Sequence, residues 1–247
     1  MEKRNNELAG LIREIAQGLK RFNFPELKRP RVPPNAPATL ELVAWGAKVY
    51  CFSWMRHVCT LLEGTVTLLE SGNNQSARIL ARSIFELGAH AYYVTKHLKQ
   101  HIQEAKFSVA WEFLTPIATG SRYMNEQIPE ESELFPAPAH ISKAIKCFSE
   151  VMPQSTQEDY SYLSEFCHPN VLAFFQYYEW FDPETVRFVD YKPKEGFLGA
   201  TTAATIQGLL VAEELLAIVH EQDVRCPLVA LLRTIAEKAG TTDTMSA

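Results

Sequence analysis

Residues 74–98, which decide the fold, read NQSARILARSIFELGAHAYYVTKHL. The polar side chains of this stretch recur every four residues, as Arg78, Arg82, Glu86 and His90. At 100° per residue such a series drifts by only about 40° per step, so the four side chains form one narrow stripe on an otherwise apolar helix. A helix with so wide an apolar surface is buried on most of its sides. The stretch therefore predicts a central helix of an all-α bundle.

A second long helical pattern comes directly before this one, from Thr39 to Glu70. The sequence between them, Ser71-Gly72-Asn73-Asn74, supplies a glycine suited to a helix C-terminus and an asparagine suited to an N-terminus. We therefore expect the next helix to begin at about Gln75. Two long helices joined by so short a loop pack as an antiparallel hairpin.

The rest of the chain also has helical patterns. We expect an N-terminal helix over residues 2–22, an extension of the second long helix to about Tyr123 with an interruption near Pro116, a loop over 128–138, and helices over 141–151, 156–181, 199–221 and 227–239. Only residues 186–191 alternate like a strand. The small-residue run 199–204 predicts close helix packing, in the core or at a dimer interface. The expected fold is a bundle of about six to seven helices with the long antiparallel hairpin at its centre.

The composition agrees with this fold. The 247 residues are 47% hydrophobic and include only 11 glycines against 14 prolines, so few tight strand turns are available. The formal net charge of -5 argues against a protein that coats nucleic acid or anionic lipid by electrostatics alone, although it leaves room for a local basic patch.

The sequence divides into four segments. These are an N-terminal helix at 1–24, a proline-rich basic arm at 25–38, an all-α helical domain at 39–240 and a frayed tail at 241–247. The arm contains Lys28, Arg29 and Arg31, which could contact an acidic partner or could simply be solvated.

The N-terminal pattern and the cysteines indicate the cellular compartment in which we expect the protein. The N-terminus alternates charged and apolar residues, unlike a signal peptide, and no apolar run is long and uninterrupted enough to predict a membrane span. The five cysteines form no CxxC pair. Cys51 and Cys59 lie about 12 Å apart on one predicted helix, too far for a disulfide. We expect a cytoplasmic protein with reduced cysteines.

The stripe on the central helix is the first candidate site. Its arginines come before its glutamate, the reverse of the order that stabilises an isolated helix. This order favours arginines retained for a partner. Arg82 and Glu86 are the central candidates, and Arg78, His90 and Asn74 are candidate ligand contacts along the same helix. The alternative is that Arg82 and Glu86 form a buried ion pair that fixes helix register.

The second candidate feature is YSYLSEFCHPN, residues 160–170. Because Pro169 falls inside a helical pattern, we expect a kink at His168-Pro169, at a cost of about 3 kcal/mol. Tyr160, Ser164 and His168 are spaced by four and share a face, and Tyr162 lies between them in sequence. A pocket that joined His168 and Ser164 to Arg82 and Glu86 would hold a base, a cationic clamp and a carboxylate. In the alternative, His168 only caps a freed carbonyl.

Other kinds of site have weaker signals. Glu86 and His90 have a spacing compatible with two metal ligands, and His168 could be a third, yet there is no HExxH and no Cys/His cluster, so we predict no metal and no cofactor. His97 and His101 are expected to face solvent. The phosphate-binding motifs GxxxxGK[ST] and GxGxxG are absent, as is GxSxG.

These motifs resemble those of a group of uncharacterised bacterial helical proteins that are classed only as domains of unknown function. In that group an A-R-S-x-F-E helix and a Y-x-x-L-S-x-x-x-H-P helix recur, matching residues 81–86 and 160–169 here. More distantly, the chain is similar to HEPN-type helical bundles, many of which are dimeric, metal-independent endoribonucleases of toxin and phage-defence systems. Those bundles carry an Arg-x(4–6)-His motif on one helix. Here an active centre would pair Arg82 and His168 from two different helices.

The resemblance implies a bacterial helical protein of defence or stress response that acts on RNA or a nucleotide as a homodimer. In that function His168 would be the general acid or base, Arg82 the phosphate clamp, and Glu86 and Ser164 supporting groups. The alternative is a non-catalytic interaction or ligand-binding module with a buried Arg/Glu/His network. A metal-dependent hydrolase is a third possibility.

Overall fold

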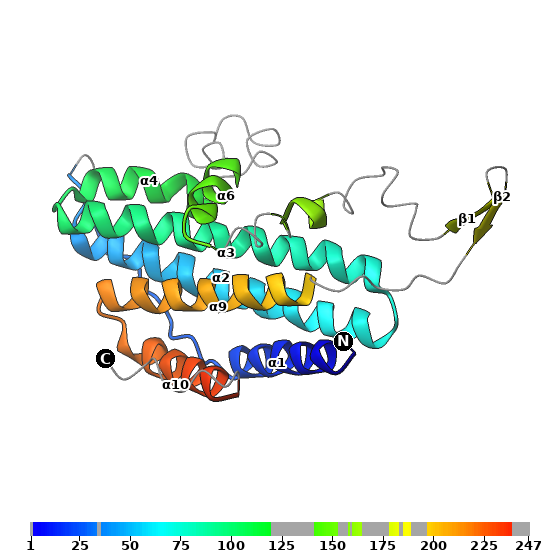
Figure 1. Cartoon of the computed structure of the whole chain (residues 1–247). Helices are drawn as coiled ribbons and strands as arrows, with labels where there is room; N and C mark the ends of the chain where they lie inside the picture. Colours follow the sequence, from blue (N-terminus) through cyan, green and yellow to red (C-terminus); the bar gives the residue numbers. More distant parts are fainter. Residues whose placement is uncertain are drawn as a thin grey trace.

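The computed structural model describes residues 2–33, 36–119, 141–152, 158, 160–164, 178–182, 185–188 and 197–238. Its long helices run roughly along a common direction, and the architecture confirms the all-α bundle (Figure 1). Two long helices, α2 (Leu40–Glu70) and α3 (Asn74–Gln103), pack against each other as the predicted hairpin. The Thr39 hydroxyl caps α2 by accepting a hydrogen bond from the Leu42 amide at 3.3 Å.

The turn between α2 and α3 uses the residues that the sequence indicated. Gly72 has a left-handed φ of +76°, and the Asn73 amide donates to the Leu68 carbonyl at 2.8 Å, as in a Schellman motif. The Asn73 side chain then caps α3 by accepting from the Ser76 amide at 3.2 Å. The cap is therefore Asn73, and Asn74 is the first residue of the helix.

The prediction that α3 continues to about Tyr123 is wrong. The chain reverses at residues 104–106 and forms α4 (Phe107–Thr119), which packs back on α2 and α3. The reversal depends on Ala105, which has a φ of +53°, while the Lys106 amide donates to the His101 carbonyl at 2.8 Å. This is the same ending as at Gly72, made without a glycine. Pro116 lies within α4 and does not mark the break.

The C-terminal helices are α9 (Phe197–Ile218) and α10 (Gln222–Lys238). The expected start of the last helix at Pro227 is wrong, because the chain turns earlier, at His220, with a φ of +55°. The Glu221 carboxylate then accepts from the Asp223 amide at 3.1 Å and pairs with Lys48 of α2 at 2.8 Å. These contacts begin α10 one turn before Pro227, which the helix tolerates.

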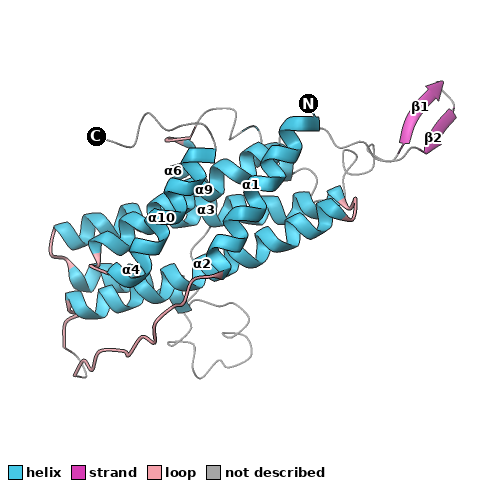
Figure 2. Cartoon of the chain, turned by 90° about the horizontal axis from the view of Figure 1, so that it is seen from below, coloured by secondary structure: helices cyan, strands magenta, loops and turns pink. Residues whose placement is uncertain are grey.

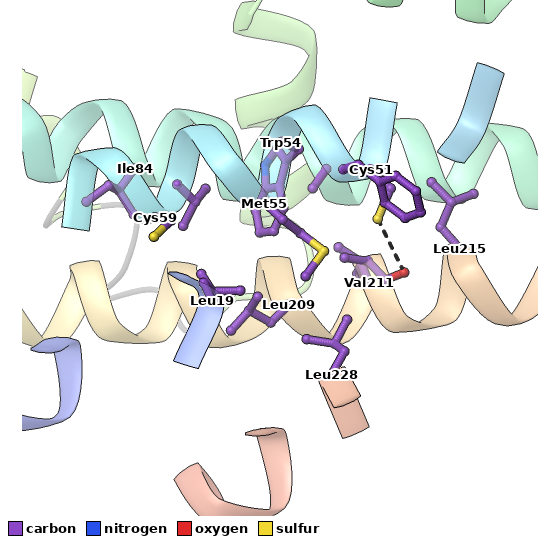
Figure 3. Close-up of a cluster of buried hydrophobic side chains, with 14 of the residues drawn as sticks. Leu19, Cys51, Trp54, Met55, Cys59, Ile84, Leu209, Val211, Leu215 and Leu228 are labelled. Carbon is purple, nitrogen blue, oxygen red and sulfur yellow. Dashed lines mark hydrogen bonds between the residues drawn. The ribbon is translucent and has the colours of Figure 1, made fainter. Parts of the chain in front are cut away.

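α9 lies at the centre of the bundle, in contact with α2, α3, α10 and the N-terminal helix α1 (Glu2–Lys20). The core between these helices is formed by buried side chains from all five (Figure 3): Leu19, Cys51, Trp54, Met55, Cys59, Ile84, Leu209, Val211, Leu215 and Leu228. A shorter helix, α6 (Ile141–Ser149), packs on α3. The buried stripe of α1 makes this helix part of the same core.

The predicted close packing of the small-residue run is present inside the molecule. A methyl group on Gly88 of α3 would lie 2.6 Å from the Ala204 carbonyl oxygen of α9. Gly208, one turn after Ala204, faces the Trp54 ring, which a methyl group there would meet at 2.5 Å. The Trp54 indole nitrogen donates to the Leu87 carbonyl at 2.9 Å. Three helices thus meet with their backbones close together around one tryptophan.

The helix expected over residues 156–181 is wrong at its C-terminal end. Residues 160–164 are helical, but Tyr178–Asp182 forms strand β1, which pairs antiparallel with β2 (Thr185–Phe188). The expected strand at 186–191 overlaps β2. The hairpin contacts none of the described helices and projects from one end of the bundle (Figure 2). The expected loop at 128–138, the kink at His168-Pro169 and the tail at 241–247 lie outside the described residues.

The described part of the basic arm lies on the bundle. Phe24 packs on Phe52 with ring centroids 5.0 Å apart, and the Trp45 indole nitrogen donates to the Leu27 carbonyl at 3.4 Å. The Arg29 guanidinium lies over the rings of Trp45 and Trp111, 5.6 and 6.0 Å from their centroids. Arg29 therefore holds the arm against α2 and α4.

α9 is also long and apolar enough to cross a membrane, by length and composition. Its most apolar window is 56% buried inside the bundle, so burial in the core accounts for its composition. Among the described residues, Cys51, Cys59, Cys147 and Cys226 are free thiols.

Candidate functional site

The structure divides the polar stripe of α3 into an exposed and a buried part. Arg82 and Glu86 keep 24% and 26% of their side-chain surface exposed, whereas Arg78 is fully buried and His90 is half-buried. Flanking positions such as Ala81 and Phe85 face the apolar interior. The exposed part of the stripe is therefore the pair Arg82–Glu86.

Tyr160 joins this pair from the helical segment 160–164, which lies against α3 (Figure 1). Arg82 Nε donates to Glu86 Oε1 at 2.9 Å, and the Tyr160 hydroxyl donates to the same oxygen at 3.0 Å. The Arg82 guanidinium also lies 5.9 Å from the centroid of the Tyr160 ring. Two of the residues predicted from separate motifs thus meet at one carboxylate oxygen.

The two oxygens of Glu86 differ in their surroundings. Oε1 accepts both hydrogen bonds, while Oε2 accepts none within the described part of the chain. Burial raises the pKa of the Tyr160 hydroxyl, and the negative charge of Glu86 raises it further. Tyr160 therefore stays a hydrogen-bond donor at neutral pH. A carboxylate that is fixed through one oxygen presents the other in a defined direction to a ligand.

Packing fixes the position of Tyr160. Its ring stacks on Phe85 with centroids 5.0 Å apart and planes inclined by 26°. The Ser164 hydroxyl donates to the Tyr160 carbonyl at 2.9 Å, so this serine bonds to the backbone of its own helical turn. His168 lies outside the described residues, and its pairing with Arg82 stays a prediction.

Arg78 is fully buried and His90 is half-buried, and both contact residues of other segments. The Arg78 guanidinium lies 5.6 Å from the ring centroids of both Tyr162 and Phe197. His90 Nδ1 is 2.9 Å from the Tyr50 hydroxyl of α2. Burial lowers the pKa of His90 and raises that of Tyr50 well above its usual value, which favours a neutral pair. These contacts favour a structural role for both stripe residues.

Two of these interior partners, Tyr50 and Phe197, were not predicted. Both lie in strongly apolar stretches, and nothing in their spacing singles them out from other core residues. Asn74, a predicted ligand contact, is half-buried at the start of α3, where its amide nitrogen donates to the Gly72 carbonyl at 3.4 Å. Asn74 makes none of its hydrogen bonds within the described part of the chain to Arg82 or Glu86.

The sequence predicts that His97 and His101 face solvent, but the structure buries both in part. Both are half-buried, and their rings pack on Phe113 of α4 with centroids 5.3 and 6.2 Å away. Burial lowers the pKa of His97, and the neighbouring His101 and Lys96 lower it further. In the described residues, no group of three or more His, Cys, Asp or Glu side chains is arranged to hold a metal ion.

Comparison with known proteins places the stripe in a known family model. A model described as "Family of unknown function (DUF5677)" matches residues 48–152, which include most of α2 together with α3, α4 and α6. The matched region contains Arg78, Arg82, Glu86 and His90, and it ends before Tyr160. No curated protein and no solved structure matches the chain. The match identifies a region of unknown function that includes α3 and most of α2.

Proposed function

We propose that Arg82, Glu86 and Tyr160 form the centre of a site for a phosphate-bearing ligand, RNA or a nucleotide. We further propose that the chain is a metal-independent endoribonuclease or nucleotide-binding protein of bacterial defence or stress response. The observation that carries the proposal is the Glu86 carboxylate, which is held through Oε1 by Arg82 and Tyr160 and lies at a partly exposed surface.

The chemistry of these three groups suits such a ligand. An arginine is always charged and presents several N–H donors, which match phosphate oxygens. The second oxygen of Glu86 is an acceptor for a ligand hydroxyl. Because the Tyr160 ring is stacked on Phe85 and its hydroxyl holds Glu86, the cluster keeps its geometry without a ligand.

The cleavage part of the proposal adds His168, which follows Ser164 by four residues in the sequence. A histidine has an ordinary pKa near neutrality, which suits a general acid or base in transesterification of RNA. The resemblance to HEPN-type bundles supports this role and a homodimeric assembly, while the proposed cytoplasmic location rests on the cysteine pattern. The chain has no Arg-x(4–6)-His motif at His168, so this role requires Arg82 of α3 to pair with His168 from another segment.

A second candidate is a non-catalytic module in which the stripe stabilises the bundle. The full burial of Arg78 between Tyr162 and Phe197 favours it, as does the bond of His90 to Tyr50. Removing one member of a buried charged network costs about 3–5 kcal/mol of stability. This candidate predicts that substitutions along the stripe lower the melting temperature and change no RNA or nucleotide property.

The test compares Arg82→Ala with Arg225→Ala. The control arginine makes the same Nε–Oε1 pair, to Glu213 at 2.6 Å, with exposed fractions of 34% and 22%. Binding is measured by fluorescence anisotropy with a labelled RNA and a labelled nucleotide, and cleavage by gel assay of RNA in EDTA. We expect Arg82→Ala to weaken binding about 10–100-fold, the usual loss for a charged hydrogen-bonding partner, and Arg225→Ala to bind like the wild type.

Two further variants separate the roles of the groups. Glu86→Gln keeps the shape of the side chain and removes its charge, and His168→Ala removes the proposed acid or base. We expect both to reduce RNA cleavage more than RNA binding. If Arg82→Ala binds RNA and nucleotide as the wild type does and only its melting temperature falls, the ligand-site proposal is wrong and the structural module is supported.

A further inference from the structure

We propose that His97 and His101 bind a divalent transition-metal ion, such as Ni²⁺, Zn²⁺ or Cu²⁺, across one turn of α3. The two residues are four apart on a helix, so both imidazoles leave the same side of it. Their ring centroids lie 6.5 Å apart with planes inclined by 32°. The site lies towards the end of α3, well beyond Glu86, and it is argued independently of the proposed function.

Aromatic packing orients both rings. Phe113 of α4 lies against each imidazole, and Tyr93 packs edge-on to His97 with centroids 4.5 Å apart. Neither imidazole makes a hydrogen bond within the described part of the chain, and His101 Nδ1 is buried there without a partner. The ring nitrogens thus form no hydrogen bonds to other described side chains.

The distance between the rings is close to what coordination requires. Metal–nitrogen bonds of about 2.0–2.1 Å in a tetrahedral arrangement place two imidazole centroids about 5 Å apart. The observed 6.5 Å must therefore shorten by about 1.5 Å. Metal binding would require the two rings to turn towards each other against Phe113, while the helix stays unchanged.

The surrounding charges are balanced. Each nearby lysine is paired with a glutamate, in the pairs Lys96–Glu150, Lys99–Glu214 and Lys106–Glu104. These pairs offset part of the positive charge of the lysines, although Lys96 still lowers the pKa of His97. Two imidazoles and no described carboxylate ligand select ions that prefer nitrogen over the oxygen-seeking Mg²⁺ and Ca²⁺. Water would fill the remaining positions, and the ion would link two successive turns of α3 before the reversal at Ala105.

The test uses the full chain and Ni²⁺ as the probe. Isothermal titration should give one Ni²⁺ per chain that is lost in His97→Ala and in His101→Ala. His57→Ala removes an exposed histidine of α2 and should bind as the wild type does. At free Ni²⁺ ten times the dissociation constant, the melting temperature should rise by about 3–6 °C in the wild type and the control.

A second set of measurements distinguishes the loss of a metal ligand from the unfolding of a variant. Electron paramagnetic resonance of one equivalent of Cu²⁺ should report two nitrogen ligands in the wild type and fewer in each variant. Circular dichroism without metal should show equal helix content in all four proteins. The proposal is overturned if Ni²⁺ does not bind the wild type, or if His97→Ala and His101→Ala bind it as tightly as His57→Ala does. Equal affinity of the wild type for Mg²⁺ would overturn it as well.

Discussion

The close approach of α3 and α9 at Gly88 gives a sharp prediction about stability. A methyl group at this position would lie 2.6 Å from the carbonyl oxygen of Ala204 and 3.3 Å from its carbonyl carbon. The contact is with backbone, which cannot rotate away as a flexible side chain could. The Gly88→Ala variant must therefore separate the two helices by about 0.8 Å to restore an ordinary contact near 3.4 Å.

Two opposing effects set the change in the free energy of unfolding of Gly88→Ala. Alanine is favoured over glycine inside a helix by about 1 kcal/mol, which opposes the loss. Overpacking of a close-packed core costs about 1–3 kcal/mol, and a shift of α9 also loosens the Trp54 packing at Gly208. We expect a net loss of up to about 2 kcal/mol, which corresponds to a fall in melting temperature of up to about 8 °C.

The matched control is Gly10→Ala on α1. A methyl group there would meet nothing within 4 Å, so only the helix preference of alanine remains. This variant should gain about 0.5–1 kcal/mol. Urea unfolding followed by far-ultraviolet circular dichroism measures both. If Gly88→Ala proves as stable as Gly10→Ala, the two backbones do not approach as described. Because the clash is with a carbonyl, Ala204→Gly should not rescue Gly88→Ala.

Three further predictions concern single sites. Ala105→Gly should raise the free energy of unfolding by about 0.5–1 kcal/mol in the same urea assay, because the left-handed φ of +53° costs alanine more than glycine. Burial lowers the pKa of His90 below 6.5, so the unfolded chain binds the proton first as pH falls. Stability should then decrease as pH drops below about 6.5, and His90→Gln should flatten this decrease in urea unfolding measured between about pH 7.5 and 5.5. Burial raises the pKa of Cys51 to about 12, so iodoacetamide at neutral pH should leave Cys51 of the native protein unmodified and alkylate the exposed Cys226, as read by peptide mass spectrometry.

The sequence predicted the fold where local signals agreed with packing. The α2–α3 turn carries Gly72 and Asn73, which have the conformations that such residues favour. It did not predict the reversal at Ala105, because an alanine in the left-handed region gives no local sequence signal. It did predict a break after residue 221, close to the turn at His220, but it placed the start of the last helix too late. Tertiary packing of the following helices stabilises those turns and overrides the local preference.

The candidate site was predicted in part for a similar reason. A spacing of four placed Arg78, Arg82, Glu86 and His90 in one stripe, and the helix confirms that arrangement. The stripe divides into buried and exposed members because Tyr162 and Phe197, far away in sequence, cover Arg78. Spacing within one helix contains no information about which distant segment packs on it.

The position of Trp54 makes its intrinsic fluorescence sensitive to the packing of the helical core. Its indole is buried, bonded to the Leu87 carbonyl of α3 and pressed against Gly208 of α9, so its emission depends on three helices at once. Trp45 and Trp111 are half-buried beneath Arg29 and sense the arm instead. A variant that keeps Trp54 and replaces Trp45, Trp111 and Trp180 would report an opening of the helical core by its fluorescence alone.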